Sequence, residues 1–138
     1  MPNYWLLKTE PNTYSYDDLV RDGKTTWDGV TNALALKHLR SMSRGDLVFI
    51  YHTGDEKQIV GLAEVTSNPY RDPKYKDEKL AVIDINPRER LNRPVTLSEI
   101  KADRGFAQFE LVRMSRLSVM PVVERHRQRI ILLANRTT

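Results

Sequence analysis

The chain has 138 residues, and its 22 Lys and Arg against 18 Asp and Glu give a formal net charge of +4. This length predicts a single domain over residues 1–138, large enough to bury a core without metals or disulfides. Cysteine is absent, which excludes a disulfide scaffold, an iron–sulfur cluster, a thiolate zinc site and a cysteine nucleophile. The N-terminus has no signal-peptide pattern and no apolar run is long enough to span a bilayer, so we expect a cytoplasmic protein without membrane contact.

The first elements follow from short local signals. Residues 4–8 are aromatic and apolar, which predicts a buried strand. Ser15 and Asp18 form a capping-box pattern, which predicts a short helix that Gly23 ends.

A second helix is predicted from Asn32, an N-cap residue, to Gly45, which terminates it. Helical spacing places three apolar side chains on its inner side, namely Leu34, Leu39 and Met42.

The composition of the middle of the chain predicts a β-hairpin. Residues 46–52 have strand composition, residues 53–57 form the turn, and residues 59–65 return as the second strand. Residues 68–73 are predicted to be a loop because they hold two prolines, and residues 80–85 form another strand.

The last third adds a short helix capped by Thr96 and Glu99, an extended segment over residues 116–121 and a closing helix over residues 122–134. The expected inner positions of the closing helix are Ile130, Leu133 and Ala134. Strands and helices mix without strict βαβ alternation, which favours an α+β fold with a curved or barrel-like sheet.

Positive charge gathers at the C-terminal end of the chain. Residues 1–100 carry a net charge of −1, whereas residues 101–138 carry +5, and seven of their eight basic residues are arginines. Arginine binds phosphate in a planar, bidentate manner, so this end is a candidate phosphate-binding region. The candidate phosphate contacts are Arg113, Arg116 and Arg125. The alternative is a solvated helix face without a partner.

Several catalytic patterns are missing. The sequence has no glycine-rich nucleotide loop and no Gly-x-Ser-x-Gly elbow, and its six glycines are scattered singly. The histidines at 38, 52 and 126 do not have zinc-binding spacing. We therefore expect a binding module without a metal or cofactor rather than an enzyme.

Four segments place polar or aromatic groups at the ends of apolar strands: Lys8-Thr9-Glu10-Pro11, Trp-Asp-Gly-Val-Thr-Asn over residues 27–32, Tyr51-His52-Thr53 and Arg-Leu-Ser-Val-Met-Pro-Val over residues 116–122. Through these segments the chain resembles the EVE domain, a member of the PUA-like superfamily and a relative of the YTH domain. The resemblance runs from residue 4 to residue 133. It implies a mixed sheet rolled into a partial β-barrel and flanked by helices.

The resemblance also implies a function. EVE domains are thought to read modified bases, notably modified cytosine in DNA, and they often occur fused to restriction-type partners. We therefore expect a partner nucleic acid that carries a modified base, DNA more than RNA, with restriction-type or RNA-processing proteins as further partners. The base would leave its stack and enter an aromatic-lined pocket.

Residue roles follow from the same resemblance. Trp27, expected in a loop, aligns with the first cage tryptophan of the YTH domain, and a core residue is the alternative. Lys8 and Thr9 would meet the base edge, although a turn hydroxyl is an equal alternative for Thr9. Asn32 offers an amide donor and acceptor, and a helix N-cap is compatible with that role. Trp5 is either core or pocket floor.

The remaining candidates lie on other strands and loops. They are Tyr51, His52 and Thr53 at the end of the central strand, Pro69 and Tyr70 as a second wall, and Ser118 in the last strand. For His52, the alternative is a structural histidine.

Two other functions remain open. The same pocket could serve a sensor of a free nucleobase or nucleoside. An enzyme acting on a modified nucleotide would use His52 with Asp28 or Glu10 as its acid–base pair.

Overall fold

The computed structural model describes residues 2–136 of the chain. Its strands are β1 (Tyr4–Thr9), β2 (Thr25–Trp27), β3 (Leu47–His52), β4 (Gln58–Val65), β5 (Tyr70–Arg71), β6 (Ala81–Thr96) and β7 (Val119–Val122). Its helices are α1 (Tyr16–Asp22), α2 (Ala33–Arg40), α3 (Leu97–Ala102), α4 (Glu110–Arg113) and α5 (Glu124–Ala134), with a 3-10 turn η1 (Arg104–Phe106).

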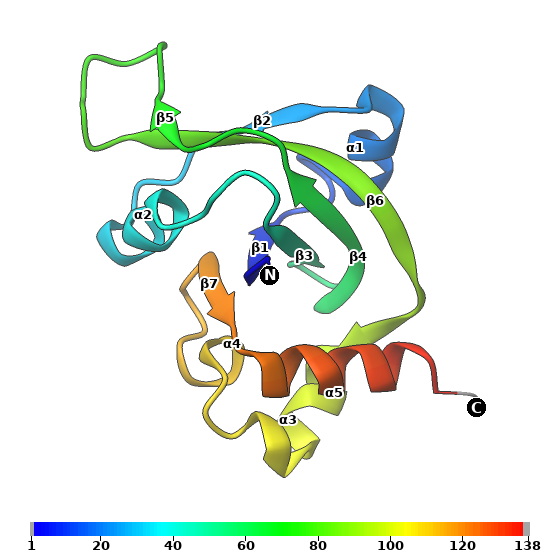
Figure 1. The fold of residues 1–138 in the computed structure, drawn as a ribbon. Coiled ribbons are helices and arrows are strands. Elements are labelled where there is room, and N and C mark those ends of the chain that lie inside the picture. The colour runs from blue at the N-terminus through cyan, green and yellow to red at the C-terminus, as the bar shows by residue number, and fades with distance from the viewer. Residues whose placement is uncertain (1, 137–138) are drawn as a thin grey trace.

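The strands form one curved mixed sheet in the order β2-β6-β4-β3-β1-β7, and β5 pairs separately with β6. Strands β1 and β3 run parallel, and the other pairs are antiparallel. The sheet rolls into a half-barrel, and α2 packs against both β6 and β7 on its open side (Figure 1). The expected α+β class with a partial barrel is confirmed.

The long strand β6 bends the sheet. Its pairing with β4 shifts register twice, between Ile59 and Gly61 and between Leu62 and Ala63. Extra residues of β6 occupy both shifts, and such bulges increase local twist and bend a strand. The expected strand over residues 80–85 was therefore too short, because the two prolines inside β6 are accommodated near these irregular positions.

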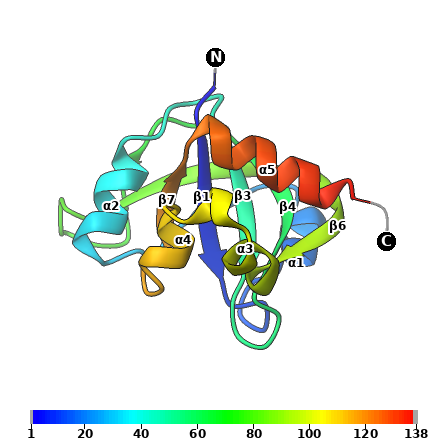
Figure 2. The ribbon, with the colours of Figure 1, turned by 90° about the horizontal axis from the view of Figure 1, so that it is seen from below.

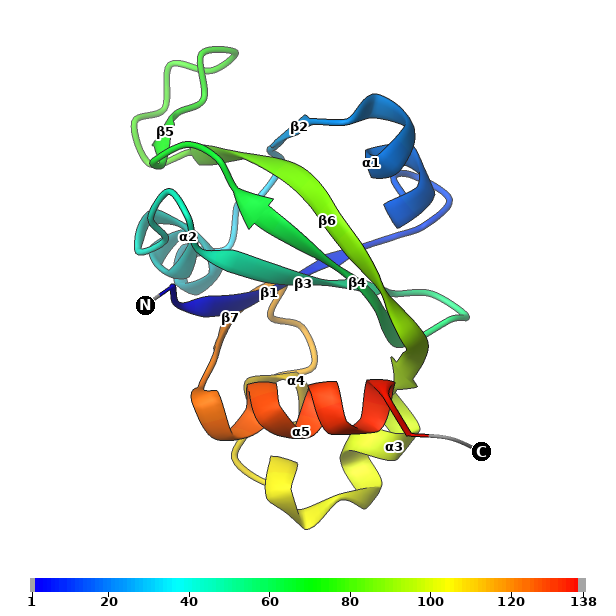
Figure 3. The same cartoon turned by 45° about the vertical axis from the view of Figure 1, so that its right-hand side comes forward.

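Helices cover both sides of the sheet. Figure 3 shows α3, α4 and α5 together on one side and α1 and α2 on the other, and Figure 2 shows α5 crossing in front of β1 and β3. Both faces of the central strands are therefore covered, and β1 and β3 contain continuous buried runs instead of alternating ones.

Local signals at the helix starts are confirmed. Both capping boxes form, with Ser15 and Asp18 at α1 and with Thr96 and Glu99 at α3. Asn32 caps α2 and Gly23 ends α1 in the left-handed conformation.

Other boundaries were wrong. Helix α2 ends at Arg40 with Ser41 as its C-cap, before Gly45. Leu39 and Met42 are buried as expected, whereas Leu34 is half-buried and Ala35 and Leu36 take the inner positions.

The closing helix begins at Glu124, two residues later than expected, because residues 119–122 pair with β1. Ile130 and Ala134 are buried, and Leu133 is half-buried. Residues 70 and 71 were expected in a loop but pair with β6 as β5, since Pro69 and Pro73 flank the pair instead of interrupting it.

Candidate functional site

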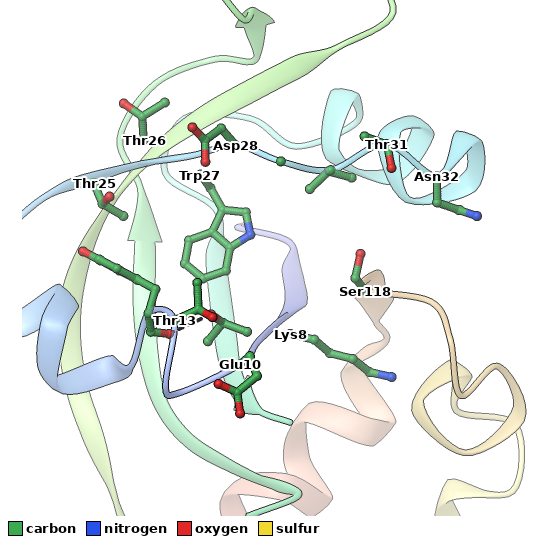
Figure 4. A pocket seen from close by; sticks show the side chains of 14 residues that line it. Lys8, Glu10, Thr13, Thr25, Thr26, Trp27, Asp28, Thr31, Asn32 and Ser118 are labelled. Atoms are coloured by element: carbon green, nitrogen blue, oxygen red, sulfur yellow. Dashed lines mark hydrogen bonds between the residues drawn. The ribbon is translucent and has the colours of Figure 1, made fainter. Parts of the chain in front are cut away.

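A pocket of about 540 Å³ lies where the end of β1, the start of β7 and the connection from β2 to α2 meet (Figure 4). It is lined by Lys8, Thr9, Glu10, Thr13, Tyr14, Thr25, Thr26, Trp27, Asp28, Gly29, Val30, Thr31, Asn32 and Ser118. Five of the residues expected from the sequence therefore converge here: Lys8, Thr9, Trp27, Asn32 and Ser118.

The indole of Trp27 forms one wall of this pocket. Trp27 ends β2, where it pairs with Ile83 of β6, so it lies on a strand and not in the expected loop. Its ring meets the ring of Tyr14 edge to face, with centroids 6.3 Å apart and planes at 81°. Gly29 adopts a φ of +80°, a left-handed conformation suited to glycine, and this turns the chain from β2 toward α2. The strand pairing of Trp27 and its contact with Tyr14 thus hold the half-buried ring in place.

The end of β1 supplies the opposite side. The amide of Lys8 donates to the carbonyl of Ser118 at 2.9 Å, which joins β1 to the segment before β7. The Lys8 ammonium donates to the carbonyl of Ser115 at 2.8 Å, and partial burial lowers the pKa of this amine. The hydroxyl of Thr9 donates to the carbonyl of Tyr14 at 2.7 Å, as the turn-hydroxyl alternative expects. Its proton is therefore engaged, and its oxygen retains acceptor capacity.

Asn32 serves the helix and the pocket with different atoms. Its side-chain oxygen accepts from the amide of Ala35 at 3.0 Å, which is the expected N-cap. Within residues 2–136 its side-chain NH₂ has no hydrogen-bond partner, and the side chain is exposed at the pocket edge. The amide donor is thus available to a ligand.

Two carboxylates also line the pocket. Glu10 accepts from the amide of Asn12 at 2.6 Å, and Asp28 pairs with the Lys74 ammonium at 3.2 Å. Each carboxylate has further acceptor capacity. The charged side chains of the lining are Lys8, Glu10 and Asp28, so the pocket itself has one more acidic than basic group.

The three residues at the end of β3 do not line the pocket. Tyr51 is buried beneath the Lys8 ammonium, which lies 5.7 Å from its ring centroid. The Thr53 hydroxyl donates to the carbonyl of Thr9.

His52 is a buried structural histidine. Its Nε2 accepts from the amide of Tyr16 at 3.0 Å, and its Nδ1 lies 2.9 Å from a carboxylate oxygen of Glu56. Both ring nitrogens are engaged, and neither partner is Asp28 or Glu10. The acid–base pair considered from the sequence is therefore not formed.

Pro69 and Tyr70 are also absent from the pocket lining. The Tyr70 hydroxyl donates to Asp84 at 2.8 Å. Its side chain lines a smaller hollow that shares Thr25, Thr26 and Asp28 with the pocket.

The three candidate phosphate-binding arginines lie at two different places on the protein. Arg113 and Arg116 line a second hollow that meets the pocket at Asn32. Arg125 lies near the start of α5, beyond the end of β7 that pairs with Tyr4, so it is at the opposite end of β1 from the pocket.

Sequence reasoning missed nine lining residues. Glu10 and residues 28–31 belong to segments already singled out as strand ends, so the signal for them was present. No local pattern marks Thr13, Tyr14, Thr25 or Thr26. Thr25 and Thr26 are placed by the pairing of β2 with β6, and Thr13 and Tyr14 lie in the connection between β1 and α1. Trp5 belongs to the core rather than the pocket floor: it is 7% exposed and its indole NH donates to Asp46 at 3.0 Å.

Metal-binding clusters and membrane-spanning helices were sought among the described residues. No group of three or more His, Asp or Glu side chains among residues 2–136 could hold a metal ion. No helix in that range is both long enough and apolar enough to cross a bilayer.

Comparisons with known proteins agree on one family. The family model for the EVE domain matches residues 3–133. Mouse thymocyte nuclear protein 1 is 32% identical over 90% of this chain and 70% of its own length.

Solved structures with the same fold are also similar to this chain. Rpa0253 from Rhodopseudomonas palustris is 38% identical, with a TM-score of 0.91 over 96% of this chain and 92% of its own. Human THYN1, solved in complex with DNA containing 5-methylcytosine, is 25% identical, with a TM-score of 0.90 over 99% of both chains.

Proposed function

Because the chain belongs to the EVE domain family, we propose that its Trp27 pocket binds a modified cytosine that has flipped out of DNA. The observation that carries this proposal is the half-buried Trp27 ring beside a hollow of about 540 Å³ that also holds hydrogen-bonding groups. Pockets of roughly 300–1,000 Å³ with a few convergent polar groups are typical of small-ligand sites. The human relative bound to 5-methylcytosine DNA supports the choice of base.

Stacking on Trp27 offsets the cost of base flipping. Removing a base from its stack costs a few kcal/mol, and an aromatic face returns about 1–3 kcal/mol per stacked base. The contact with Tyr14 holds the indole in place before the ligand arrives, so less rotational freedom is lost on binding.

Polar groups of the lining complement a cytosine edge. The exocyclic amino group of cytosine is a donor that carboxylates accept, and Glu10 and Asp28 supply carboxylate oxygens. The ring nitrogen and carbonyl of cytosine are acceptors, and the free amide of Asn32 supplies a donor. A 5-methyl group requires an apolar contact, which the side chain of Val30 or the methyl groups of the threonines can provide.

The charge of the pocket favours a second candidate, a free nucleobase or nucleoside. With Lys8 against Glu10 and Asp28, the lining itself does not attract a phosphate. A neutral monomer would bind with little dependence on salt, whereas DNA binding weakens as salt rises.

The test compares matched oligonucleotides that carry cytosine or 5-methylcytosine at one position, measured by fluorescence anisotropy over a salt series. The free nucleoside is titrated beside them. We expect the methylated strand to bind at least tenfold more tightly than the unmethylated strand. The Trp27→Ala variant should lose about 1–3 kcal/mol of this binding, whereas Trp27→Phe should retain most of it.

Tyr75→Ala is the matched control, since Tyr75 is an exposed aromatic residue outside the pocket lining. Equal affinity for methylated and unmethylated strands, or full binding by Trp27→Ala, would refute the proposal. Binding of the nucleoside as tightly as the strand would select the second candidate.

A further inference from the structure

A second hollow of about 490 Å³ adjoins the Trp27 pocket. It is formed by Asn32 and Leu34 at the start of α2 and by residues 113–117, which run from the last residue of α4 into its connection to β7. The two hollows share Asn32, and Ser118 of the pocket directly follows this segment. A ligand anchored in the pocket therefore has an adjoining space into which it can extend.

The second hollow has the positive charge that the pocket lacks. Arg113 and Arg116 are both exposed, and within residues 2–136 neither guanidinium forms an ion pair with a carboxylate. Arg127 and Arg129 differ, because they pair with Glu124 and Asp103. The free guanidinium groups of Arg113 and Arg116 are thus able to bind a phosphate in a bidentate manner.

The segment that carries these arginines is fixed at several points. The Lys8 ammonium binds the carbonyl of Ser115, and the amide of Leu117 donates to the carbonyl of Met114 at 3.0 Å. Leu117 is buried, so the segment is anchored to the core. Met114 is 40% exposed at the hollow, and a thioether side chain adapts well to the apolar face of a sugar or base.

We propose that this second hollow binds the nucleotide next to the flipped base, with its phosphate on Arg113 and Arg116 and its sugar or base against Met114. The protein then recognises a short single-stranded segment of at least two nucleotides, not an isolated base. This inference rests on the proposed function of the Trp27 pocket. It also explains how a pocket with more acidic than basic groups holds a polyanion, because the phosphate contacts lie beside the base site and not within it.

The test measures how affinity depends on ligand length. The ligands are 5-methyl-2′-deoxycytidine and a three-nucleotide DNA strand with that nucleoside at its centre. We expect the wild-type protein to bind the trinucleotide about ten- to a hundredfold more tightly than the nucleoside, because hydrogen bonds to charged groups are among the strongest.

The Arg113→Gln/Arg116→Gln variant should lose this gain and keep the nucleoside affinity. Its plot of log affinity against log salt should be shallower by about 0.7, because the two arginines share one phosphate of a single strand. The matched control is Arg104→Gln/Arg125→Gln, which removes the same charge from exposed positions outside the hollow. The control should keep both the gain and the salt slope.

A length-dependent gain that survives in the Arg113/Arg116 variant, or a wild-type protein without such a gain, would overturn this inference alone. If neither the nucleoside nor the trinucleotide binds, the function of the pocket fails together with it. Loss of nucleoside binding in the Arg113/Arg116 variant would also overturn the inference, since it would place the two arginines in the base site and not beside it.

Discussion

The rings of Trp27 and Tyr14 meet edge to face, with their centroids 6.3 Å apart. Tyr14 lies in the connection between β1 and α1, whereas Trp27 ends β2, so the contact joins two segments that flank α1. The Tyr14 hydroxyl also donates to Asp22 at 2.8 Å, which ties the tyrosine to the end of α1. The orientation of the Trp27 wall therefore depends on Tyr14.

Replacing Tyr14 by leucine should weaken binding of the methylated strand by about three- to tenfold, since an edge-to-face aromatic pair contributes about 0.5–1.5 kcal/mol. Tyr14→Phe keeps the ring and removes the hydroxyl with its bond to Asp22, so its affinity should stay within about twofold. Fluorescence anisotropy with the methylated strand makes the measurement. Equal affinities for the leucine and phenylalanine variants would show that the aromatic contact has no part in ligand binding.

Sequence reasoning succeeded where the signal was local. The capping pairs Ser15 with Asp18 and Thr96 with Glu99 each span three residues, and both formed as expected. Strand β6 extended beyond the expectation because its pairing with β4 continues through irregular positions that hold its prolines. Bulges depend on the partner strand, and the partner is not visible in a local pattern.

The difference between local signals and contacts with distant segments also explains which site residues were predicted correctly. Residues at strand ends were expected to meet, and those of β1 and β7 do, because the two strands are neighbours in the sheet. Tyr51 and His52 end a strand that also neighbours β1, but both side chains are buried outside the pocket. The side of the sheet that carries the pocket depends on where α1 and β2 pack. Neither placement can be predicted from the spacing of residues along the chain.

His126 should make stability depend on pH. Its side chain is buried against Phe106 and Phe109, and within residues 2–136 neither ring nitrogen has a partner at hydrogen-bond distance and angle. Burial lowers the pKa of His126 and the nearby charge of Arg125 lowers it further, whereas Glu110 and the nearby backbone of Gly105 partly oppose the shift. The folded state therefore favours the neutral ring.

The unfolded chain binds the proton at the ordinary pKa of about 6.5, so it carries more protons than the folded state just below that value. Stability should be full above pH 6.5 and should fall as the pH drops below it, by at most about 1.4 kcal/mol per pH unit for this group. Urea unfolding at pH 7.5 and pH 5.5 measures the difference. His126→Leu should reduce it.

His38→Gln is the comparison variant, because burial also lowers the pKa of His38 and gives a pH dependence of the same sign. An unchanged loss of stability in His126→Leu would assign the effect to other groups.

Asp46 should be a major determinant of stability although it lies far from the pocket. The carboxylate is 4% exposed and accepts from the amides of Asn3 and Ser43 and from the indole of Trp5. Asp46→Ala leaves these donors without their acceptor and should cost about 2–3 kcal/mol in the free energy of unfolding. Asp55→Ala, at an exposed turn position, should change it by less than about 0.5 kcal/mol. A loss of similar size in both variants, measured by urea unfolding, would contradict this role.

Asn32 allows the contribution of α2 to stability to be separated from its contribution to binding. The side-chain oxygen caps the helix, the side-chain NH₂ is not used by the cap, and the residue lines both adjoining hollows. Asn32→Asp retains the cap, because aspartate is as good an N-cap as asparagine, but it removes the donor. We expect unchanged stability within about 0.5 kcal/mol and at least fivefold weaker binding of the methylated strand.

Asn32→Ala removes both groups and should lose about 0.5–2 kcal/mol of stability as well as affinity. Thr96→Ala is the matched control, since Thr96 caps α3 away from the pocket and should lose stability without losing affinity. If Asn32→Asp bound the strand as the wild type does, Asn32 would be a helix cap alone. The Watson–Crick acceptors of the base would then need another donor, and the hydroxyls of Thr25 and Thr31 in the same lining would be the next to test.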